Sequence, residues 1–226
     1  MPIALLENEA RVTLEKYGIE NVPGAFCKTR EEALIQAEKL GYPVVLKVVS
    51  HQVVHKSDAG GVKVNLADAA AVEAAYDDIV ASVKQRVPDA EIEGMLVTKM
   101  IKGAKEVIVG ALHDSQFGAC VMTGLGGIFV EVFKDVSFGI APLNKQEARE
   151  MLQSLKSYPI LTGSRGEKPV NLDALCQLLV NVSEYAYESG ALEMDLNPVF
   201  CVDDKVLIGD ARILLPSRKD GGQGYA

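Results

Sequence analysis

A histidine, a lysine and two adjacent glycines lie within eight residues at positions 55–62, directly after an apolar stretch of the chain. An imidazole can carry a phosphoryl group as a covalent nucleophile, and a lysine can neutralise the charge of that group. Glycines allow backbone N–H groups to approach phosphate oxygens closely. The chain has three histidines, His51, His55 and His113, so few side chains could take this role. The segment predicts a phosphoryl carrier at His55, and the alternative is a solvated turn rich in polar side chains.

A second group of polar side chains lies near the C-terminus, where Asp195 and Asn197 precede Asp210. If residues 203–204 form the two-residue turn of a hairpin, continuing the register places Asn197 opposite Asp210. Opposite residues have Cβ atoms about 5 Å apart, and Asp195 lies on the same face of its strand as Asn197. Carboxylate and amide oxygens suit Mg²⁺, which takes its other ligands from water or phosphate. The spacing therefore predicts a Mg²⁺ site, and the alternative is a solvated hairpin face. Pro198 within this strand requires an edge position or a bulge.

Two further features could bind phosphate. Lys47 lies near the end of an apolar stretch, from which its ammonium group could face an anion, although a surface lysine is the commoner arrangement. Gly126 and Gly127 belong to a glycine-rich segment whose backbone amides could also face phosphate. That segment lacks the Lys-Ser/Thr pair of a P-loop and the helical context of a dinucleotide-binding fingerprint. Both features are therefore candidates that need a structural context.

Residues that could contact a nucleotide base and ribose lie around an expected hinge in the middle of the chain. Lys99, Met100 and Ile101 offer backbone groups and an apolar wall for a flat purine. Glu106 and Arg165 could contact the ribose or a transferred phosphoryl group. Each of these five side chains could equally be an ordinary core or surface residue.

Apolar periodicity, helix caps and glycine or proline breaks predict alternating helices and strands, which indicates an α/β (α+β) fold with two lobes. We expect a smaller lobe at 22–102 that carries the His55 loop, a larger lobe at 103–226 that carries the metal hairpin, and a joining N-terminal helix within 1–21. Expected helices cover residues 8–17, 29–40, 68–86, 145–156 and 172–189. Expected strands cover a segment ending at Cys27, residues 44–49, 62–66, 95–100, 106–112, 118–123 and 128–138, and a final pair within 192–215.

Composition limits the classes of partner. The 226 residues are 48% hydrophobic and carry a formal net charge of −8. The chain has no Lys/Arg cluster of the kind that binds nucleic acid or an anionic membrane, and no apolar run reaches the ~18 residues of a membrane span. The four cysteines lie far apart in apolar surroundings without a C-x-x-C pair, so we expect reduced core thiols. Because the N-terminus does not read as a signal peptide, we expect a cytoplasmic protein with small-molecule or protein partners.

Several motifs occur together and in a fixed order. They are YPVVLK at 42–47, HKSDAGG at 55–61, EVIVG at 106–110, GLGGIFVE at 124–131, GSRG at 163–166, DLNP at 195–198 and DAR at 210–212. In this order they resemble the β subunit of ADP-forming acetyl-CoA synthetases, the ATP-grasp half of the NDP-forming acyl-CoA synthetases, over about residues 5–215. More distantly, the chain resembles the β subunit of succinyl-CoA synthetase.

The resemblance implies a two-lobed ATP-grasp fold that clamps ATP or ADP. It implies His55 as a phosphohistidine on a mobile loop, Asn197 and Asp210 as Mg²⁺ ligands, and Lys47 near the phosphates. The reaction of the family is acetyl-CoA + ADP + phosphate ⇌ acetate + CoA + ATP, an acid–thiol ligase reaction whose last step this chain would perform. The implied partner is a CoA-binding α subunit, and the assembly typical of the family is an α2β2 heterotetramer.

Two other functions remain open on the sequence. Similar ATP-grasp domains are fused to protein lysine acetyltransferases, where the domain can serve regulation rather than turnover. An autonomous ATP-grasp carboxylate–amine ligase would activate its acid as an acyl phosphate and would not need His55. The presence of His55 together with Asn197 and Asp210 favours an active phosphoryl carrier over both alternatives.

Overall fold

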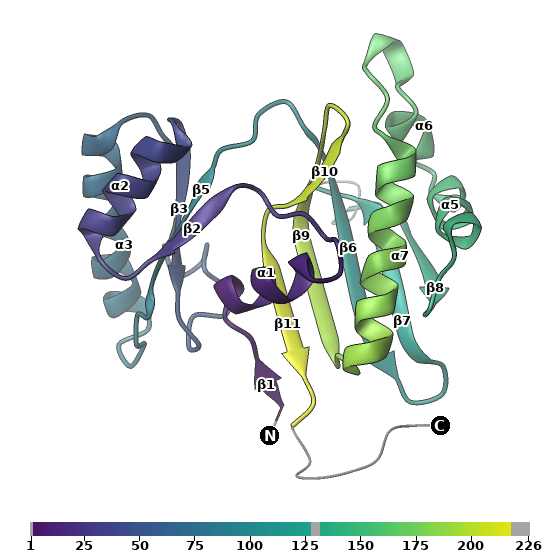
Figure 1. The fold of residues 1–226 in the computed structure, drawn as a ribbon, viewed down its shortest axis with the longest axis horizontal. Coiled ribbons are helices and arrows are strands. Elements are labelled where there is room, and N and C mark those ends of the chain that lie inside the picture. The colour runs from purple at the N-terminus through teal and green to yellow at the C-terminus, as the bar shows by residue number, and fades with distance from the viewer. Residues whose placement is uncertain (1, 128–131, 218–226) are drawn as a thin grey trace.

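The computed structural model describes residues 2–127 and 132–217, which form two β-sheets with helices packed against them (Figure 1). Within these residues, the smaller sheet has four strands in the order β2-β5-β3-β4. The larger sheet has seven strands, six of them in the order β1-β11-β9-β6-β7-β8, with β10 paired to β9. Each sheet has its own hydrophobic core, so the chain is divided into two packed halves.

The smaller half places Lys47 on the face of its sheet that looks toward the larger half. Its strands are β2 (Gly24–Cys27), β3 (Val44–Val49), β4 (Val62–Leu66) and β5 (Gly94–Lys99), and its helices are α2 (Arg30–Leu40) and α3 (Ala69–Arg86). The side chains of Thr29 and Asp68 cap the two helices by accepting hydrogen bonds from backbone N–H groups of the first turn. Leu46 and Val48 of β3 pack into the core beneath the helices, so Lys47 between them points to the opposite face.

The larger half is built in the same way and exposes polar residues of its longest strands to the other half. Its strands are β1 (Ile3–Ala4), β6 (Lys105–Asp114), β7 (Gly118–Leu125), β8 (Val136–Ile140), β9 (Glu193–Val202), β10 (Lys205–Ile208) and β11 (Ala211–Leu215). Its helices are α5 (Lys145–Ser154), α6 (Tyr158–Leu161) and α7 (Leu172–Ser189). A short 3₁₀ turn at Ser164–Gly166 lies between α6 and α7. Met194 and Leu196 of β9 are buried in the core with Leu175 and Leu179 of α7. The alternate β9 residues, among them Asp195, are therefore on the face away from α7.

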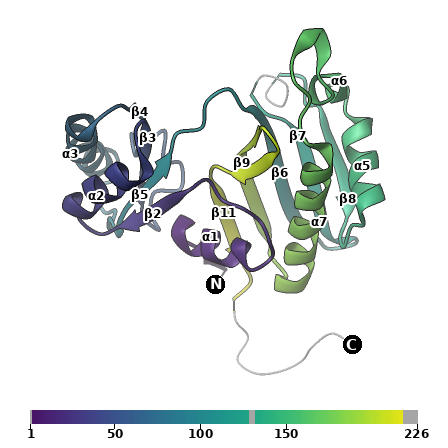
Figure 2. The ribbon, with the colours of Figure 1, turned by 45° about the horizontal axis from the view of Figure 1, so that its top comes forward.

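The N-terminal segment belongs to the larger half by its contacts. β1 pairs antiparallel with β11 at the edge of the larger sheet, and Ala10 and Leu14 of α1 (Glu7–Glu15) are fully buried in the larger core. From α1 the chain passes to the smaller half along β10, where the N–H of Val22 donates to the carbonyl of Ile208 at 2.9 Å. Helix α1 thus lies at the junction of the two halves (Figure 2).

Most predicted elements are confirmed, with β3, β4, α3 and α7 at their expected bounds. The strand predicted at 128–138 is confirmed at 136–138, where β8 begins, but is wrong at 132–135, where residues 132–133 form a turn. Lys134 has φ = 50°, which ends extended structure there, and the buried Asp135 accepts hydrogen bonds from the N–H groups of Lys156 and Ser157. Residues 128–131 of that prediction lie outside the described part of the chain. Strand β1 and helix α6 were not predicted, and the region 192–215, expected to hold a pair of strands, forms three, β9, β10 and β11.

Two expectations from composition can be compared with the structure. No helix in the described residues is both long and apolar enough to cross a membrane. All four cysteines lie in the described part and are free thiols, with Cys27, Cys176 and Cys201 buried and Cys120 half-buried. Burial raises the pKa of Cys27 to about 11 and that of Cys201 to about 12, as expected for unreactive core thiols.

Candidate functional site

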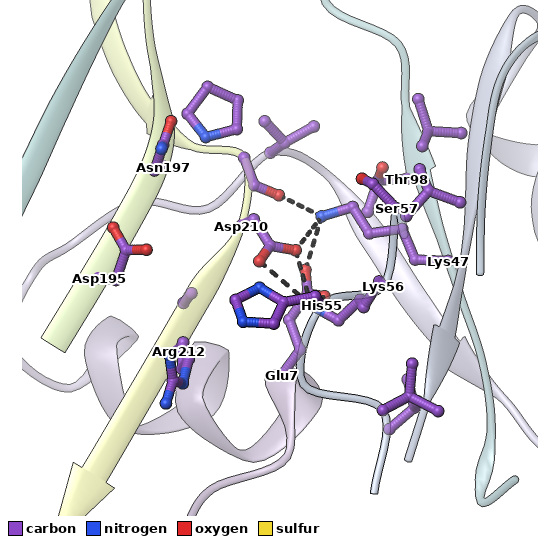
Figure 3. A pocket seen from close by; sticks show the side chains of 18 of the residues that line it. Glu7, Lys47, His55, Lys56, Ser57, Thr98, Asp195, Asn197, Asp210 and Arg212 are labelled. Carbon is purple, nitrogen blue, oxygen red and sulfur yellow. Dashed lines mark hydrogen bonds and ion pairs between the residues drawn. The ribbon is translucent and has the colours of Figure 1, made fainter. Parts of the chain in front are cut away.

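A cavity of about 600 Å³ lies between the two halves (Figure 3). Its walls are formed by the start of α1, strand β3, the loop between β3 and β4, the end of β5, and the neighbouring strands β9 and β11. The predicted site residues that line it are Lys47, His55, Lys99, Met100, Ile101, Glu106, Asp195, Asn197 and Asp210. The fold therefore brings together residues that are far apart in the sequence.

Four charged side chains form a cluster in this cavity, and we call Glu7, Lys47, Lys56 and Asp210 the charged cluster. The ammonium group of Lys47 lies 2.8 Å from Glu7 Oε1 and 2.8 Å from Asp210 Oδ1, and it donates to the carbonyl of Gly209 at 2.6 Å. The Lys47 side chain is 9% exposed and the Glu7 side chain 1%. Burying a charge is costly unless it is paired, so the opposite charges stabilise one another here.

Lys56 completes the charged cluster from the loop that carries His55. Its Nζ forms an ion pair with Glu7 Oε2 at 2.7 Å. The same ammonium group donates to both Asp210 oxygens, at 2.9 and 3.1 Å. Burial would lower the pKa of Lys56, but the carboxylates of Glu7 and Asp210 outweigh it and raise the pKa above its usual value. Lys56 is therefore held as a cation inside the cavity.

The two carboxylates of the cluster are shifted in opposite directions. Burial would raise the pKa of Asp210, yet the ammonium groups of Lys47 and Lys56 outweigh it and hold that pKa well below its usual range. For Glu7 the desolvation is stronger, and it raises the pKa although Lys47 and Lys56 oppose the shift. Asp210 is thus the more firmly ionised of the two.

His55 lies on the loop between β3 and β4 and is directed into the cavity toward the side that carries Asp210 (Figure 3). The imidazole is exposed, whereas Val53 and Ala59 on either side of it are buried in the smaller core. The N–H of Gly61 donates to the carbonyl of Lys56 at 2.7 Å, which closes the base of the loop. Both ends of the loop are therefore anchored while its tip, with His55, borders open space.

Asn197 and Asp210 lie opposite each other in the predicted register. In that register β10 pairs with β9 up to the Ile208–Val199 pair, and β11 continues it from the Ala211–Leu196 pair. The N–H of Asn197 donates to the carbonyl of Asp210 at 3.3 Å. Against β6, the register shifts here, because Asn197 and Pro198 of β9 lie opposite one β6 residue, Ile108. This bulge in β9 meets the requirement that Pro198 imposed. The hairpin prediction is confirmed in its register.

Asp195 lies two residues from Asn197 on the same strand, opposite Arg212. Its side chain is exposed at the cavity wall, yet desolvation there, followed by repulsion from Asp210, raises its pKa. Within residues 2–127 and 132–217, no group of three or more His, Cys, Asp or Glu side chains is arranged to hold a metal ion. Two carboxylates and one amide fit a hard cation that takes its remaining ligands from phosphate and water, rather than a cation enclosed by protein.

Comparison with known proteins decides the family. The ATP-grasp domain family matches residues 3–215. The chain is 46% identical over 212 residues to the β subunit of the ADP-forming acetate–CoA ligase I of Pyrococcus furiosus, covering 93% of this chain and 91% of that subunit. The chain belongs to this ATP-grasp family of ligase β subunits. It is also 49% identical over 219 residues to the ADP-forming acetate–CoA ligase I of Archaeoglobus fulgidus, but it spans only 32% of that longer chain.

Solved ATP-grasp structures share the whole fold. One is the dinucleotide-forming acetyl-coenzyme A synthetase 1 of Ca. Korarchaeum cryptofilum in complex with coenzyme A, Ca-AMPCP and HgCl⁺. It has a TM-score of 0.91 and 47% identity, and the match covers 94% of this chain and 93% of that one. Another structure of that enzyme contains Mg-AMPPCP, with its phosphohistidine segment pointing towards the nucleotide binding site. Its TM-score is 0.81 at 42% identity, with 94% of this chain and 93% of that one covered.

The residues predicted to contact a nucleotide divide into two groups. Lys99, Met100, Ile101 and Glu106 line the cavity at the connection between the two halves. Lys99 already donates to the carbonyl of Gly41 at 2.6 Å, so its ammonium group is directed to the backbone of the smaller half. These four residues therefore lie together where the chain passes from the smaller half to the larger half.

The second group consists of Gly126, Gly127 and Arg165. The N–H of Gly126 donates to the carbonyl of Glu106 at 2.8 Å, so this amide is used within the sheet edge rather than offered to a phosphate. Neither Gly126 nor Gly127 is among the residues of the cavity wall. Arg165 lies in the short 3₁₀ turn after α6, and its side chain is outside what the structure describes.

Glu7 is the functional candidate that sequence reasoning missed. It lies in the first turn of α1, where an acidic residue is usually read as a partner of the helix dipole. A signal was nonetheless present, because Glu7 shares its helix face with Ala10, Arg11 and Leu14 at spacings of three, four and seven residues. An acid on the buried stripe of an amphipathic helix indicates a buried ion pair.

Proposed function

We propose that His55 is the phosphoryl carrier of an ADP-forming acyl-CoA synthetase and that this chain, as the β subunit, exchanges that group with ADP or ATP. The complete reaction would be acetyl-CoA + ADP + phosphate ⇌ acetate + CoA + ATP. The observation that carries the proposal is the placement of His55, Lys47 and the facing pair Asn197 and Asp210 around one cavity. The names of the ligase relatives and the phosphohistidine segment of the solved enzyme support the same assignment.

The chemistry requires a nucleophile that can also leave. In the direction of ATP formation, an oxygen of the ADP β-phosphate attacks the phosphorus on His55, and the P–N bond breaks with its electron pair returning to the imidazole. In the reverse direction, a neutral imidazole nitrogen attacks the γ-phosphorus of ATP and ADP leaves. Lys47 and Lys56 lie beside this path as cations that offset the charge of the transferred group.

Asn197 and Asp210 would hold Mg²⁺, with Asp195 as a further oxygen donor from the same strand. When bound there, the ion would supply positive charge that offsets the negative charge of the nucleotide phosphates. The oxygen chemistry of the donors and the Mg-AMPPCP of the solved relative support this assignment. Lys99, Met100, Ile101 and Glu106 would then contact the base and ribose.

The proposed partner would perform the part of the reaction that this chain does not perform. The chain corresponds to nearly all of a named β subunit but to about a third of a single-chain relative. We infer that the remaining chemistry, which includes CoA binding, belongs to an α subunit, and that the complete enzyme is an α2β2 heterotetramer. Sedimentation of the reconstituted enzyme would give one species of two chains of each kind.

The experiment that tests the function measures ATP formation from acetyl-CoA, ADP and phosphate by the chain combined with a CoA-binding partner subunit and Mg²⁺. His55→Ala should abolish turnover, whereas His113→Ala, an exposed histidine at the far end of β6, should retain it. A carboxylate–amine ligase would keep its activity in His55→Ala. A regulatory module would bind nucleotide without turnover in any variant.

A further inference from the structure

Glu7 is the most deeply buried carboxylate of the charged cluster, and its two oxygens have different partners. Oε1 lies 2.8 Å from Lys47 on β3, and Oε2 lies 2.7 Å from Lys56 on the His55 loop. Its side chain is 1% exposed, compared with 29% for Asp210. A carboxylate so enclosed needs cationic partners, and one of its two partners comes from the loop, so the ion pair couples the position of the loop to Glu7.

The loop is attached on two sides. On the smaller half, Arg86 of α3 donates to the carbonyl of Asp58 at 2.6 Å. Across the cavity, Lys56 reaches α1 and β11 of the larger half through Glu7 and Asp210. Because Lys56 is the immediate neighbour of His55, this second attachment determines how far the imidazole enters the cavity.

The two carboxylates that bind Lys56 differ in what else they can bind. Asp210 faces Asn197 at the cavity wall, so a cation or a phosphate-bound ion that enters the cavity meets Asp210 first. Glu7 is almost fully closed off from solvent, so an ion that enters the cavity would compete for Asp210 and not for Glu7. The Glu7–Lys56 contact would therefore hold the loop while the nucleotide site is in use.

We propose that Glu7 is a positioning residue that docks the His55 loop at the nucleotide site through its ion pair with Lys56. The inference deepens the proposed function and rests on it for the role of His55, whereas the docking itself does not require phosphoryl transfer. Departure of the loop from the site requires the Glu7–Lys56 contact to break, and its return requires the contact to form again.

The docking is tested by amide hydrogen exchange across residues 51–58 in the full chain without nucleotide or added metal. Glu7→Gln keeps the size of the side chain but removes its charge, and Lys56→Met removes the partner while Glu7 keeps Lys47. Both variants should exchange at least about tenfold faster than wild type in this segment. Glu9→Gln, the same change on the same helix at an exposed position, should leave the segment unchanged.

Unchanged exchange across 51–58 in both variants would overturn the proposal. If Glu7→Gln accelerates exchange throughout the molecule because it is misfolded, Lys56→Met decides, since Lys56 lies on a surface loop and its change leaves the Glu7–Lys47 pair intact.

A second readout separates docking from chemistry. In Glu7→Gln, the rate at which Mg²⁺ and ATP label His55 should fall at least about tenfold while the Kd for ATP stays within about threefold of wild type. A labelling rate equal to wild type would contradict the positioning role. Absence of any label in wild type would instead refute the proposed function, and the exchange experiment would still decide whether Glu7 docks the loop.

Discussion

Two walls of the cavity carry the proposed functional residues: the hairpin wall, with Asn197 and Asp210, and the loop wall, with His55. The hairpin wall is held much more firmly than the loop wall. Asn197 lies on β9, which is paired on both sides, and Asp210 directly precedes β11, which pairs with β9 and β1. Leu196 of β9 and Ile213 of β11 are fully buried in the larger core. His55 faces them from a loop whose tip is exposed and whose contact across the cavity consists of the ion pairs of Lys56.

The difference matches two chemical tasks. A metal site needs ligands fixed to within a fraction of an ångström, which paired strands provide. A phosphoryl carrier that serves two sites must leave one of them, and ion pairs in a partly solvated cavity can break without disturbing either hydrophobic core. Under the proposed function, the firmly held wall would carry the metal ligands and the loop would carry the nucleophile.

The largest expected effect comes from breaking the hairpin wall at Asp210. Asp210→Asn removes the charge that binds Lys47 and Lys56 and weakens the proposed Mg²⁺ site. Labelling of His55 by Mg²⁺ and ATP should fall by about 10²–10³-fold, the range typical of losing one electrostatic contact to a transferred group. The same change in the exposed turn of the hairpin, Asp204→Asn, should have no effect on the labelling rate. Equal losses in the two variants would show that the hairpin acts only through its overall stability.

The next effect concerns the base of the loop wall at Gly61. A Cβ there would lie 2.4 Å from Val48 Cγ1, so Gly61→Ala should lower the free energy of unfolding by about 1–3 kcal/mol, as overpacking does. Urea denaturation of wild type and variant measures it. In a Val48→Ala background, which makes room for the new methyl group, the cost of Gly61→Ala should be smaller. An equal cost in both backgrounds would mean that Val48 is not the obstacle.

A pH series tests the contribution of one charge of the hairpin wall, that of Asp210, to stability. Because Lys47 and Lys56 hold the pKa of Asp210 below its usual value of 3.8, the stability it contributes is fully present above that value and is lost as the pH falls below it. In metal-free buffer, the difference in urea midpoint between wild type and Asp210→Asn should be constant from pH 7 to pH 5 and shrink toward pH 3. A difference that is independent of pH would contradict this ionisation.

The smallest effect is expected outside the cavity, where Lys63 of β4 pairs with Asp78 of α3. The side chains are 36% and 55% exposed, so Asp78→Asn should change the free energy of unfolding by less than about 1 kcal/mol. It should also leave the labelling of His55 at the wild-type rate. A loss of labelling rate as large as that expected for Asp210→Asn would mean that burial is not what distinguishes the charged cluster.

Local sequence signals were enough to predict many of the helices and strands. Helices were expected from residues 29 and 68, and Thr29 and Asp68 cap them, while the turn at 203–204 fixed the register that brings Asn197 to Asp210. Such features depend on residues within a few positions or on one hairpin, where backbone geometry leaves little choice.

Other features depend on packing between distant segments and could not be predicted in the same way. Glu7 lies 40 and 49 positions from its two lysines, and the pairing of β1 with β11 is what brings α1 beside them. The strand expected through residues 132–135 does not form, because Asp135 is held by backbone N–H groups after α5 rather than by a neighbouring strand.

The most direct test of the account is the mass of the purified chain after incubation with Mg²⁺ and ATP, followed by peptide mapping at alkaline pH, where phosphohistidine survives. If His55 is the phosphoryl carrier, one phosphoryl group is added on His55, is removed again by ADP and is absent from His55→Ala. Label on any other residue, or label that persists in His55→Ala, would contradict it.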